Sequence, residues 1–413
     1  MLTIHHPEVI ERENETILQA RIESKELDEV LWFSTSSEYG RFLCHERGDA
    51  FLVALFLYAM RRGMDITVEA PVSERLYYML TKHLMPTITT IFPHCHLVKV
   101  HCPLDEGHLD SAGAVGVGFS CGVDSMYTIS KHTKEDCPQS RKLTHLAFFN
   151  VGASGDFGGD VARDLFRRGA EAVRPCAEEL GLPMVTLDSN LSEILMMNYV
   201  ATYVYRNAAA VLALQKLFNV YYFSSGYSLR QFELSPADSG HYDFYSLSML
   251  STNDTELVMS GETLSRLEKT DVVSEYPLSY RHLCVCVRAE RNCSRCFKCQ
   301  RTMVTLDVLG KLDRYGAVFD LDHYQAHRSR YIGSVISDRK ADSYKQDIYE
   351  EMVRRNFALP TAARIFRYPL AAAHTAHRRT PHTLKNAYWK VFRVGMACSP
   401  HFVKVRYRRM KRL

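Results

Sequence analysis

A short run of small and polar residues, Phe119-Ser-Cys-Gly-Val-Asp-Ser125, follows an apolar segment and precedes a helical pattern that starts at Met126. Small residues at such a turn let successive backbone N–H groups converge on one anion, and the hydroxyls of Ser120 and Ser125 add donors beside a helix N-terminus. The carboxylate of Asp124 can help to hold Mg²⁺ next to bound phosphates. The pattern predicts a phosphate or pyrophosphate site, with an ordinary strand-to-helix turn as the alternative.

Five of the twelve cysteines fall between residues 284 and 299. Cys284, Cys293, Cys296 and Cys299 have the spacing C-x8-C-x2-C-x2-C, and four thiolates in one short loop can close a tetrahedral zinc site. In a cytoplasmic chain such clustering favours metal over disulfides. Cys286 could replace Cys284, but two residues further along a strand we expect it to be a packed thiol. An iron–sulfur cluster is the alternative metal centre.

The run Ser120 to Ser125 resembles the Ser-Gly-Gly-x-Asp-Ser signature of the PP-loop (N-type) ATP pyrophosphatases. The resemblance implies an adenine-nucleotide α-hydrolase fold and an enzyme that splits ATP between its α- and β-phosphates to adenylate a substrate oxygen. It implies ATP and Mg²⁺ as cofactors. Cys121 departs from the signature, which has Gly, and a Cβ there is strained if φ is positive. In a sulfur-transferring relative this thiol would be a nucleophile or persulfide carrier. The loop residues implied to bind the cofactor are Ser120, Cys121, Gly122, Val123, Asp124 and Ser125.

Such a loop followed by this cysteine spacing resembles the 7-cyano-7-deazaguanine synthase family over roughly residues 114–310. Segments around Arg206, Ser239–Asp243 and Glu268–Val273 fit the family in the same order. The resemblance implies that Arg206 and Lys269 are cations near the triphosphate, where both side-chain types suit phosphate oxygens. Asp124, Lys269 and Arg206 are thus the implied catalytic residues, and Asp243 and Asn207 the implied substrate-binding residues. Asp156, in a Gly-rich loop, is a further candidate for the nucleotide cleft.

The implied chemistry is activation of a carboxylate. A carboxylate does not react with ammonia at neutral pH, because the anion repels nucleophiles and has no leaving group. In a mechanism like the family's, the carboxylate attacks the α-phosphorus while Ser120, Gly122, Ser125 and Lys269 stabilise the departing pyrophosphate. Ammonia or another amine then displaces AMP, giving an amide or an attachment to a protein or peptide, with a deazaguanine-type substrate. In the deazaguanine synthases a second adenylation, of the amide oxygen, gives the nitrile. The alternatives are a tRNA-modifying sulfurtransferase of the same superfamily and a non-catalytic nucleotide- or nucleic-acid-binding protein.

The elements that must position these residues alternate between strands and helices, which predicts an α/β fold with a parallel sheet. Expected strands lie at 114–119, 143–149, 184–187 and 220–224, and expected helices at 161–180, 208–218 and 301–310. The alternating patterns in residues 1–112 predict a small α/β domain, with strands at 29–33 and 65–69 and helices at 49–62 and 73–83. Such an added domain could dock a partner. The predicted organisation is 1–112, a PP-loop domain at 113–318 with its zinc loop at 284–299, and a basic helical region at 319–413 with helices at 342–357 and 383–394.

The charge of the chain is unevenly distributed. Its formal net charge is +4, but Met352 to Leu413 hold 15 Lys and Arg and no Asp or Glu, which leaves 36 basic and 47 acidic side chains before them. Basic tracts at 374–382 and 404–413 could form a solvated or self-docking helix pair. They could also bind nucleic acid, an anionic surface or an acidic face of this chain or a partner. A homodimer is a further partner prediction.

The overall composition, 46% hydrophobic and 24% charged, is that of a globular protein and excludes a largely disordered, collagen-like or coiled-coil chain. The longest apolar run, Ala50 to Met60, is too short for a bilayer that needs about 20 residues. The N-terminus has neither the basic nor the apolar region of a signal peptide. We therefore expect a cytoplasmic protein that is not integral to a membrane.

Overall fold

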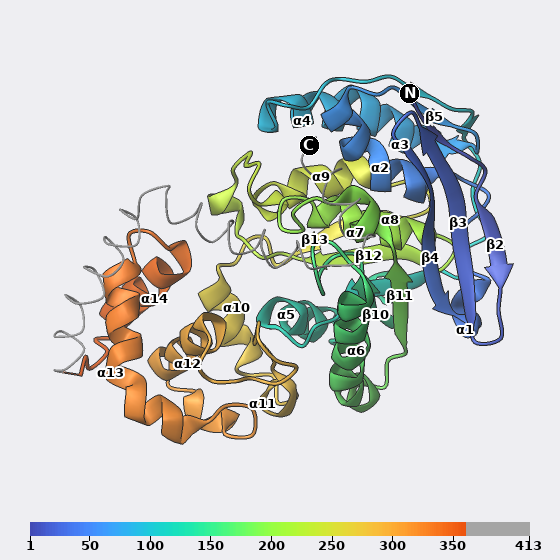
Figure 1. The fold of residues 1–413 in the computed structure, drawn as a ribbon. Coiled ribbons are helices and arrows are strands. Elements are labelled where there is room, and N and C mark those ends of the chain that lie inside the picture. Colours follow the sequence, from blue (N-terminus) through green and yellow to red (C-terminus); the bar gives the residue numbers. More distant parts are fainter. Residues whose placement is uncertain (361–413) are drawn as a thin grey trace, which may run out of the picture. The chain divides into compact units, whose positions relative to one another are not determined.

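The computed structural model describes residues 1–360, and the chain divides into two compact units, Met1–Ala326 and His327–Leu413. An eleven-stranded, mixed and mostly parallel sheet forms the centre of the first unit (Figure 1). Helices lie on both of its sides. The α/β class predicted from the alternation of strands and helices is confirmed.

Five parallel strands form one half of this sheet, in the order β13-β12-β9-β10-β11. The chain runs from β9 outward to β11 and then crosses back to place β12 on the other side of β9. In open parallel sheets, ligands bind at the carboxyl ends of the strands where the order reverses in this way. That point is the end of β9, where the Ser120–Ser125 loop begins. The strands are β9 (Ala114–Gly118), β10 (His145–Asn150), β11 (Met184–Ser189), β12 (Phe218–Ser224) and β13 (Glu256–Ser260).

Two helical layers cover this half of the sheet. On one side lie α5 (Val123–His132) and α6 (Asp160–Leu180), and on the other α8 (Tyr203–Ala213), which packs against α2 (Asp49–Arg62) (Figure 1). The alanines of α8 are fully buried, and such small side chains let α2 approach closely. Strands and helices predicted from residue 49 to residue 224 are thus confirmed, with bounds shifted by a few residues.

The N-terminal strands continue the same sheet. A hairpin of β3 (Glu15–Ser24) and β4 (Leu27–Ser36) joins it through antiparallel pairing of β4 with β11. No division between compact units therefore falls at the expected boundary near residue 112, because one sheet crosses it. The other strands of this part are β1 (Leu2–Ile4), β2 (Glu8–Glu11), β5 (Ile66–Val68) and β7 (Val100–His101), with β6 (Val72–Ser73) and β8 (Leu104–Asp105) in a separate pair.

Short helices fill the remaining connections of the first unit. The predicted helix at 73–83 begins as α3 (Glu74–Met79) and continues through a π-helical turn, Leu80–Leu84, into α4 (Met85–Ile91). The others are α1 (Ser37–Gly40), α7 (Leu191–Leu195), α9 (Asp243–Leu250), α10 (Arg266–Val273), α11 (Ser279–His282) and α12 (Phe297–Leu309).

The helix α13 (Leu321–Asp338) crosses from the first unit into the second, which also contains α14 (Ser343–Arg354). Asp342 caps α14 by accepting a hydrogen bond from the backbone N–H of Lys345, so the helix predicted at 342–357 is confirmed in a shorter form. The predicted helix at 383–394 and the basic tracts at 374–382 and 404–413 lie outside the described residues.

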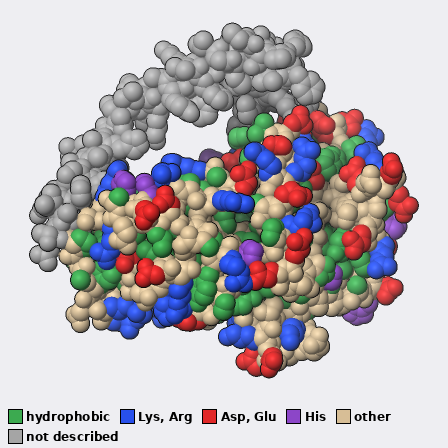
Figure 2. Space-filling view, turned by 90° about the horizontal axis from the view of Figure 1, so that it is seen from below, with side chains coloured by type: hydrophobic (Ala, Val, Ile, Leu, Met, Phe, Trp, Pro, Cys, Tyr) green, Lys and Arg blue, Asp and Glu red, His purple; other side chains and the backbone are tan. Residues whose placement is uncertain are grey.

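Charged side chains of both signs are interspersed over the face shown in Figure 2, with hydrophobic side chains between them. Within residues 1–360, no helix is both long enough and apolar enough to cross a membrane.

Candidate functional site

The Ser120–Ser125 loop connects the end of β9 to the first turn of α5. Val123 is buried and anchors the helix start, while Ser120 is exposed. The two serine hydroxyls lie 3.4 Å apart, and the hydroxyl of Ser125 donates to the carbonyl of Gly122 at 3.1 Å. The loop therefore presents hydroxyls and the N-terminal N–H groups of α5 at the point where the strand order reverses, which is a suitable place for an anion.

Cys121 has a left-handed backbone with φ of 54°, which is the conformation that favours glycine. Its carbonyl accepts a hydrogen bond of 2.8 Å from the backbone N–H of Cys284, and its side chain is buried. A hydrogen bond with Cys176 and burial raise the pKa of the Cys121 thiol far above its ordinary value. A thiol held in this way is neutral and inaccessible, unlike a reactive cysteine.

Cations surround the carboxylate of Asp124. Arg266 Nη2 lies 2.6 Å from Asp124 Oδ2, and Lys269 Nζ lies 4.0 Å from Asp124 Oδ1. Oδ1 is buried and has no hydrogen-bond partner among the described residues. An acceptor oxygen without a partner is what a carboxylate needs to bind a hydrated Mg²⁺, so Asp124 fits the predicted role. We call Asp124, Arg266 and Lys269 the charged corner.

Lys269 reaches this corner from α10, and its side chain is fully buried. Its ammonium donates to the carbonyl of Ser225 at 2.7 Å, just after β12. A Cβ on Gly261, just after β13, would lie 2.9 Å from Lys269 Cε, and φ of Gly261 is +85°. The glycine is thus required for both its conformation and the close approach. Burial lowers the pKa of the Lys269 ammonium, although Asp124 acts in the opposite direction.

Asp243 lies at the start of α9 and is electrostatically coupled to Lys269. Its carboxylate accepts hydrogen bonds from the N–H of Phe244 at 2.8 Å and from the hydroxyl of Tyr203 at 3.4 Å. Burial raises the pKa of the Asp243 carboxyl to about 7, against the effect of these partners. The structure thus brings a carboxyl group that titrates near neutrality close to the charged corner.

Arg206 and Asn207 serve the fold and do not extend the charged corner. The guanidinium of Arg206 is buried and donates to the carbonyls of Met197 and Val151 and to two hydroxyls. Asn207 donates to the carbonyl of Tyr203 and the hydroxyl of Tyr199. The structure therefore does not bring Arg206, predicted as a cation for the triphosphate, to the charged corner, because its donors are directed at neutral oxygens of neighbouring segments.

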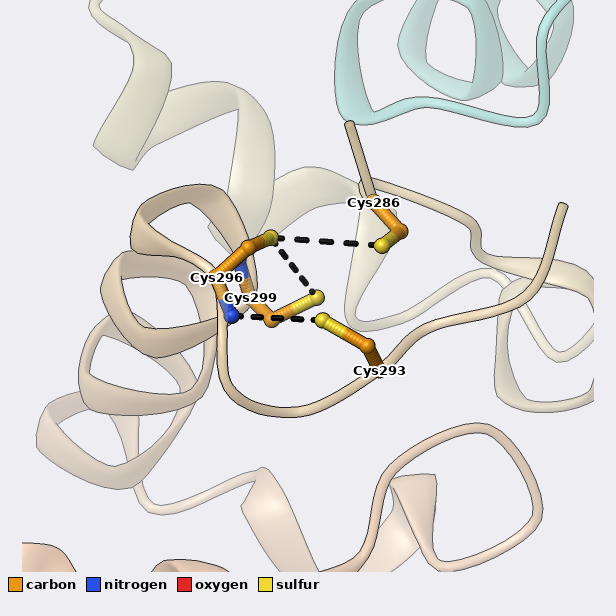
Figure 3. Close-up of side chains that lie close together, drawn as sticks. All are labelled: Cys286, Cys293, Cys296 and Cys299. Carbon is orange, nitrogen blue, oxygen red and sulfur yellow. Dashed lines mark hydrogen bonds between the residues drawn. The ribbon is translucent and has the colours of Figure 1, made fainter. Parts of the chain in front are cut away.

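Four thiols lie together at the start of α12, as Figure 3 shows. The sulfur atoms of Cys286, Cys293, Cys296 and Cys299 all lie within 4.8 Å of one another. Cys296 Sγ is 3.4 Å from Cys299 Sγ and 4.0 Å from Cys286 Sγ. Zn–S bonds of about 2.3 Å would place tetrahedral sulfurs about 3.8 Å apart, so the four thiols could hold a metal ion such as zinc. We call them the thiol cluster.

Backbone N–H groups favour the thiolate form of two members. Burial raises the pKa of the Cys293 and Cys296 thiols, but hydrogen bonds from nearby N–H groups outweigh it and hold both below the ordinary value. Cys296 is also the N-cap of α12, since its sulfur accepts from the N–H of Cys299. A metal ion bound by the cluster would therefore use the residue that also caps α12.

The prediction that Cys284 belongs to the ligand set and Cys286 does not is wrong. Cys284 uses its N–H to bind the carbonyl of Cys121, and its thiol donates to the carbonyl of Glu290 at 3.4 Å. Two residues later the chain has turned so that Cys286 joins the other sulfurs. The spacing within the thiol cluster is C-x6-C-x2-C-x2-C.

Two basic residues near Asp124 were not predicted. Arg266 is the first residue of α10, and Lys298, in the first turn of α12, is half-buried and electrostatically coupled to Asp124, Arg266 and Arg301. Both belong to ordinary polar stretches of the sequence. Their positions in the sequence could have indicated them. Arg266 lies three residues before Lys269, and Lys298 lies between Cys296 and Cys299.

The remaining candidate, Asp156, has a structural partner. Its carboxylate accepts a hydrogen bond of 3.1 Å from the N–H of Tyr199. No protein-family model, curated protein or solved structure matches this chain.

Proposed function

We propose that this protein is an ATP-dependent adenylating enzyme that forms AMP and pyrophosphate and joins an activated carboxylate to ammonia or another amine, with ATP bound over the Ser120–Ser125 loop. The observation that carries the proposal is the charged corner at the carboxyl end of β9. There Arg266 and Lys269 surround one carboxylate whose second oxygen lacks a partner among the described residues. Polyphosphate and Mg²⁺ together supply the missing partners.

Each residue of the corner has a role that follows from its charge and position. Lys269 and Arg266 would bind phosphate oxygens and stabilise the charge that develops on pyrophosphate as it leaves. Asp124 would hold Mg²⁺. The metal ion offsets the negative charge of the phosphates and so reduces their repulsion of the attacking carboxylate. The N–H groups at the start of α5 and the hydroxyls of Ser120 and Ser125 would bind the remaining oxygens.

The reaction then proceeds in two displacements. A carboxylate oxygen of the substrate attacks the α-phosphorus of ATP, and the bond to the β-phosphate breaks, releasing pyrophosphate. The nitrogen lone pair of an amine attacks the acyl carbon, AMP leaves, and one proton is lost from nitrogen. Asp243, whose carboxyl pKa is raised to about 7 by burial, could accept or donate hydrogen bonds to a ring such as a deazaguanine.

The resemblance to the PP-loop pyrophosphatases and the 7-cyano-7-deazaguanine synthases supports this reading through the residues that remain in place. Asp124, Lys269 and Asp243 are electrostatically linked through Lys269, although they come from distant parts of the chain. A sulfurtransferase receives less support, because Cys121 is buried and the pKa of its thiol is raised.

Product analysis tests the proposal. The full chain would be incubated with ATP, Mg²⁺, ammonia and 7-carboxy-7-deazaguanine, and AMP and acyl products followed by mass spectrometry. We expect AMP with an amide or nitrile, and at least a hundredfold slower AMP formation in Asp124→Asn, a loss on the scale of removing one preorganised electrostatic group. Asp136→Asn, an exposed aspartate, is the matched control. AMP formation that Asp124→Asn leaves unchanged would contradict the proposal.

We further propose that the thiol cluster binds zinc and is structural. Elemental analysis of purified protein should give about one zinc per chain, as four thiolates form a closed site. Cys286→Ser should lose most of this metal, and Cys284→Ser should retain it. The reverse result would contradict the ligand set, and iron with sulfide would indicate an iron–sulfur cluster.

A further inference from the structure

Lys298 lies between two members of the thiol cluster in the sequence, and its charge interacts with two residues of the charged corner, Asp124 and Arg266. It is the second residue of α12, and it follows the N-cap Cys296 and precedes Cys299. Its side chain is half-buried, repelled by Arg266 and Arg301 and attracted by Asp124 and Cys296. The helix α12 packs on α10, which packs on α5, and Arg266 in the first turn of α10 pairs with Asp124 in the first turn of α5.

The charges at this place favour a polyanion. Arg266 already occupies one oxygen of Asp124 at 2.6 Å, and Lys269 lies 4.0 Å from the other. With Lys298, three cations interact with the single carboxylate of Asp124, which can neutralise only one of the three positive charges. Cations held together away from water raise the free energy of the unliganded protein, and bound phosphates remove that cost.

The segment that carries the thiol cluster is hydrogen-bonded at its beginning to the Ser120–Ser125 loop, and it contains Lys298 near its end. At the beginning, the N–H of Cys284 donates to the carbonyl of Cys121 at 2.8 Å. Near the end, Lys298 lies between Cys296 and Cys299, whose sulfur atoms are 3.4 Å apart. A metal ion bound by both thiols would hold the helical turn from which the Lys298 side chain extends.

We propose that Lys298 is a phosphate-binding residue for the nucleotide and that the thiol cluster positions it. The metal site then has a second role beyond folding, because it sets the affinity for the polyphosphate. This inference rests on the proposed function and adds to it a residue and a dependence of nucleotide binding on metal.

Calorimetric titration of the full chain with α,β-methylene-ATP and Mg²⁺ tests the inference, since this analogue binds without being cleaved between the α- and β-phosphates. Lys298→Met should weaken binding about tenfold or more, the usual effect of losing a hydrogen bond to a charged group, with the metal content unchanged. Lys298→Arg should restore most of the affinity. Lys134→Met, which changes an exposed lysine, should leave binding within about twofold of wild type.

Metal removal and the Lys298→Met substitution, applied singly and together, form a thermodynamic cycle that is measured with the same ligand. Chelation should weaken binding by the wild-type chain and have little further effect on Lys298→Met, because both changes remove the same contact. Equal affinity of Lys298→Met and wild type, or equal loss on chelation in both, would overturn the inference and leave the proposed function standing. A wild-type chain that does not bind the analogue would overturn both.

Discussion

Two clusters of buried charge in the first unit differ in how completely their polar atoms are paired. Arg47, 1% exposed, donates to Asp254 at 2.6 Å, to Asp105 at 2.7 Å and to the carbonyl of Gly107 at 2.7 Å. The second oxygen of Asp254 accepts from His108 and from the N–H of Leu109. In the charged corner, by contrast, Asp124 Oδ1 has no hydrogen-bond partner within residues 1–360.

The difference separates a cluster that holds the fold together from one that is completed by a ligand. Arg47 connects the segment after β4 to residues 105–108 and to Asp254, and each nitrogen of its guanidinium takes part in these contacts. The charged corner brings cations together around one carboxylate and retains capacity for an anion. A buried charge is thus evidence for a binding site only when its pairing is incomplete.

Replacing one buried cation in each cluster by methionine should show the largest difference between the clusters, in the free energy of unfolding. Arg47→Met should lower the free energy of unfolding by about 3–5 kcal/mol, because Asp254 is left buried without its counter-charge. Lys269→Met should lower it by only about 1–2 kcal/mol, since Asp124 keeps Arg266 and the main loss is the hydrogen bond that Lys269 donates to the carbonyl of Ser225. Urea denaturation followed by circular dichroism measures both.

The same two variants separate stability from ligand binding. Lys269→Met should lose affinity for α,β-methylene-ATP, whereas the fraction of Arg47→Met that remains folded should bind it as wild type does. If Lys269→Met proved as unstable as Arg47→Met, the charged corner would belong with the structural cluster and the contrast would fail.

The pH dependence of stability gives an intermediate effect. Burial raises the folded-state pKa of the Asp243 carboxyl from 3.8 to about 7. The raised value means that this group stabilises the folded state fully below about pH 4 and that its contribution is lost as the pH rises to about 7. Asn does not titrate. The free energy of unfolding of Asp243→Asn should therefore rise by about 3 kcal/mol relative to that of wild type between pH 4 and pH 7.

Denaturation curves of wild type and Asp243→Asn at several pH values measure this change. A difference between the two that stays constant from pH 4 to pH 7 would show that Asp243 is ionised in the folded protein throughout, as a carboxylate with a complete set of partners would be.

Backbone strain at Cys121 gives the smallest effect. Cys121→Ala and Cys121→Gly both remove the buried thiol, but only glycine adopts φ of 54° without a steric penalty. The glycine variant should therefore be more stable than the alanine variant by about 1 kcal/mol. Thermal unfolding of the pair measures the strain that the loop carries, and equal stability would mean that the loop relaxes without it.

Local patterns were sufficient to predict the strand, loop and helix that place Asp124, because an apolar run followed by small residues and a helical repeat determines each of them within a short stretch of chain. The same holds for the helix at 49–62. By contrast, the pairing of β4 with β11 joins residues that are far apart and carry no mutual signal, so the sheet that crosses residue 112 was not predicted.

Long-range contacts also explain the errors within the site. Cys284 and Cys286 are equivalent by spacing, and the hydrogen bond from Cys284 to Cys121 decides which thiol joins the cluster. Arg206 has the side chain of a phosphate-binding residue, but the oxygens that occupy it belong to residues 151, 192, 197 and 202. Arg266 and Lys298 are located only by the packing of α10 between α5 and α12.

The pairing of β4 with β11 also determines an order of events during synthesis. Thr35 donates its hydroxyl to the carbonyl of Thr186, a residue that is translated 151 positions later. At ordinary elongation rates, the β3–β4 hairpin leaves the ribosome roughly 8–30 s before its partner strand. During this interval β4 has an unpaired edge that can associate with other nascent chains. The yield of folded protein should therefore depend on translation speed and on chaperones that cover this edge until β11 appears.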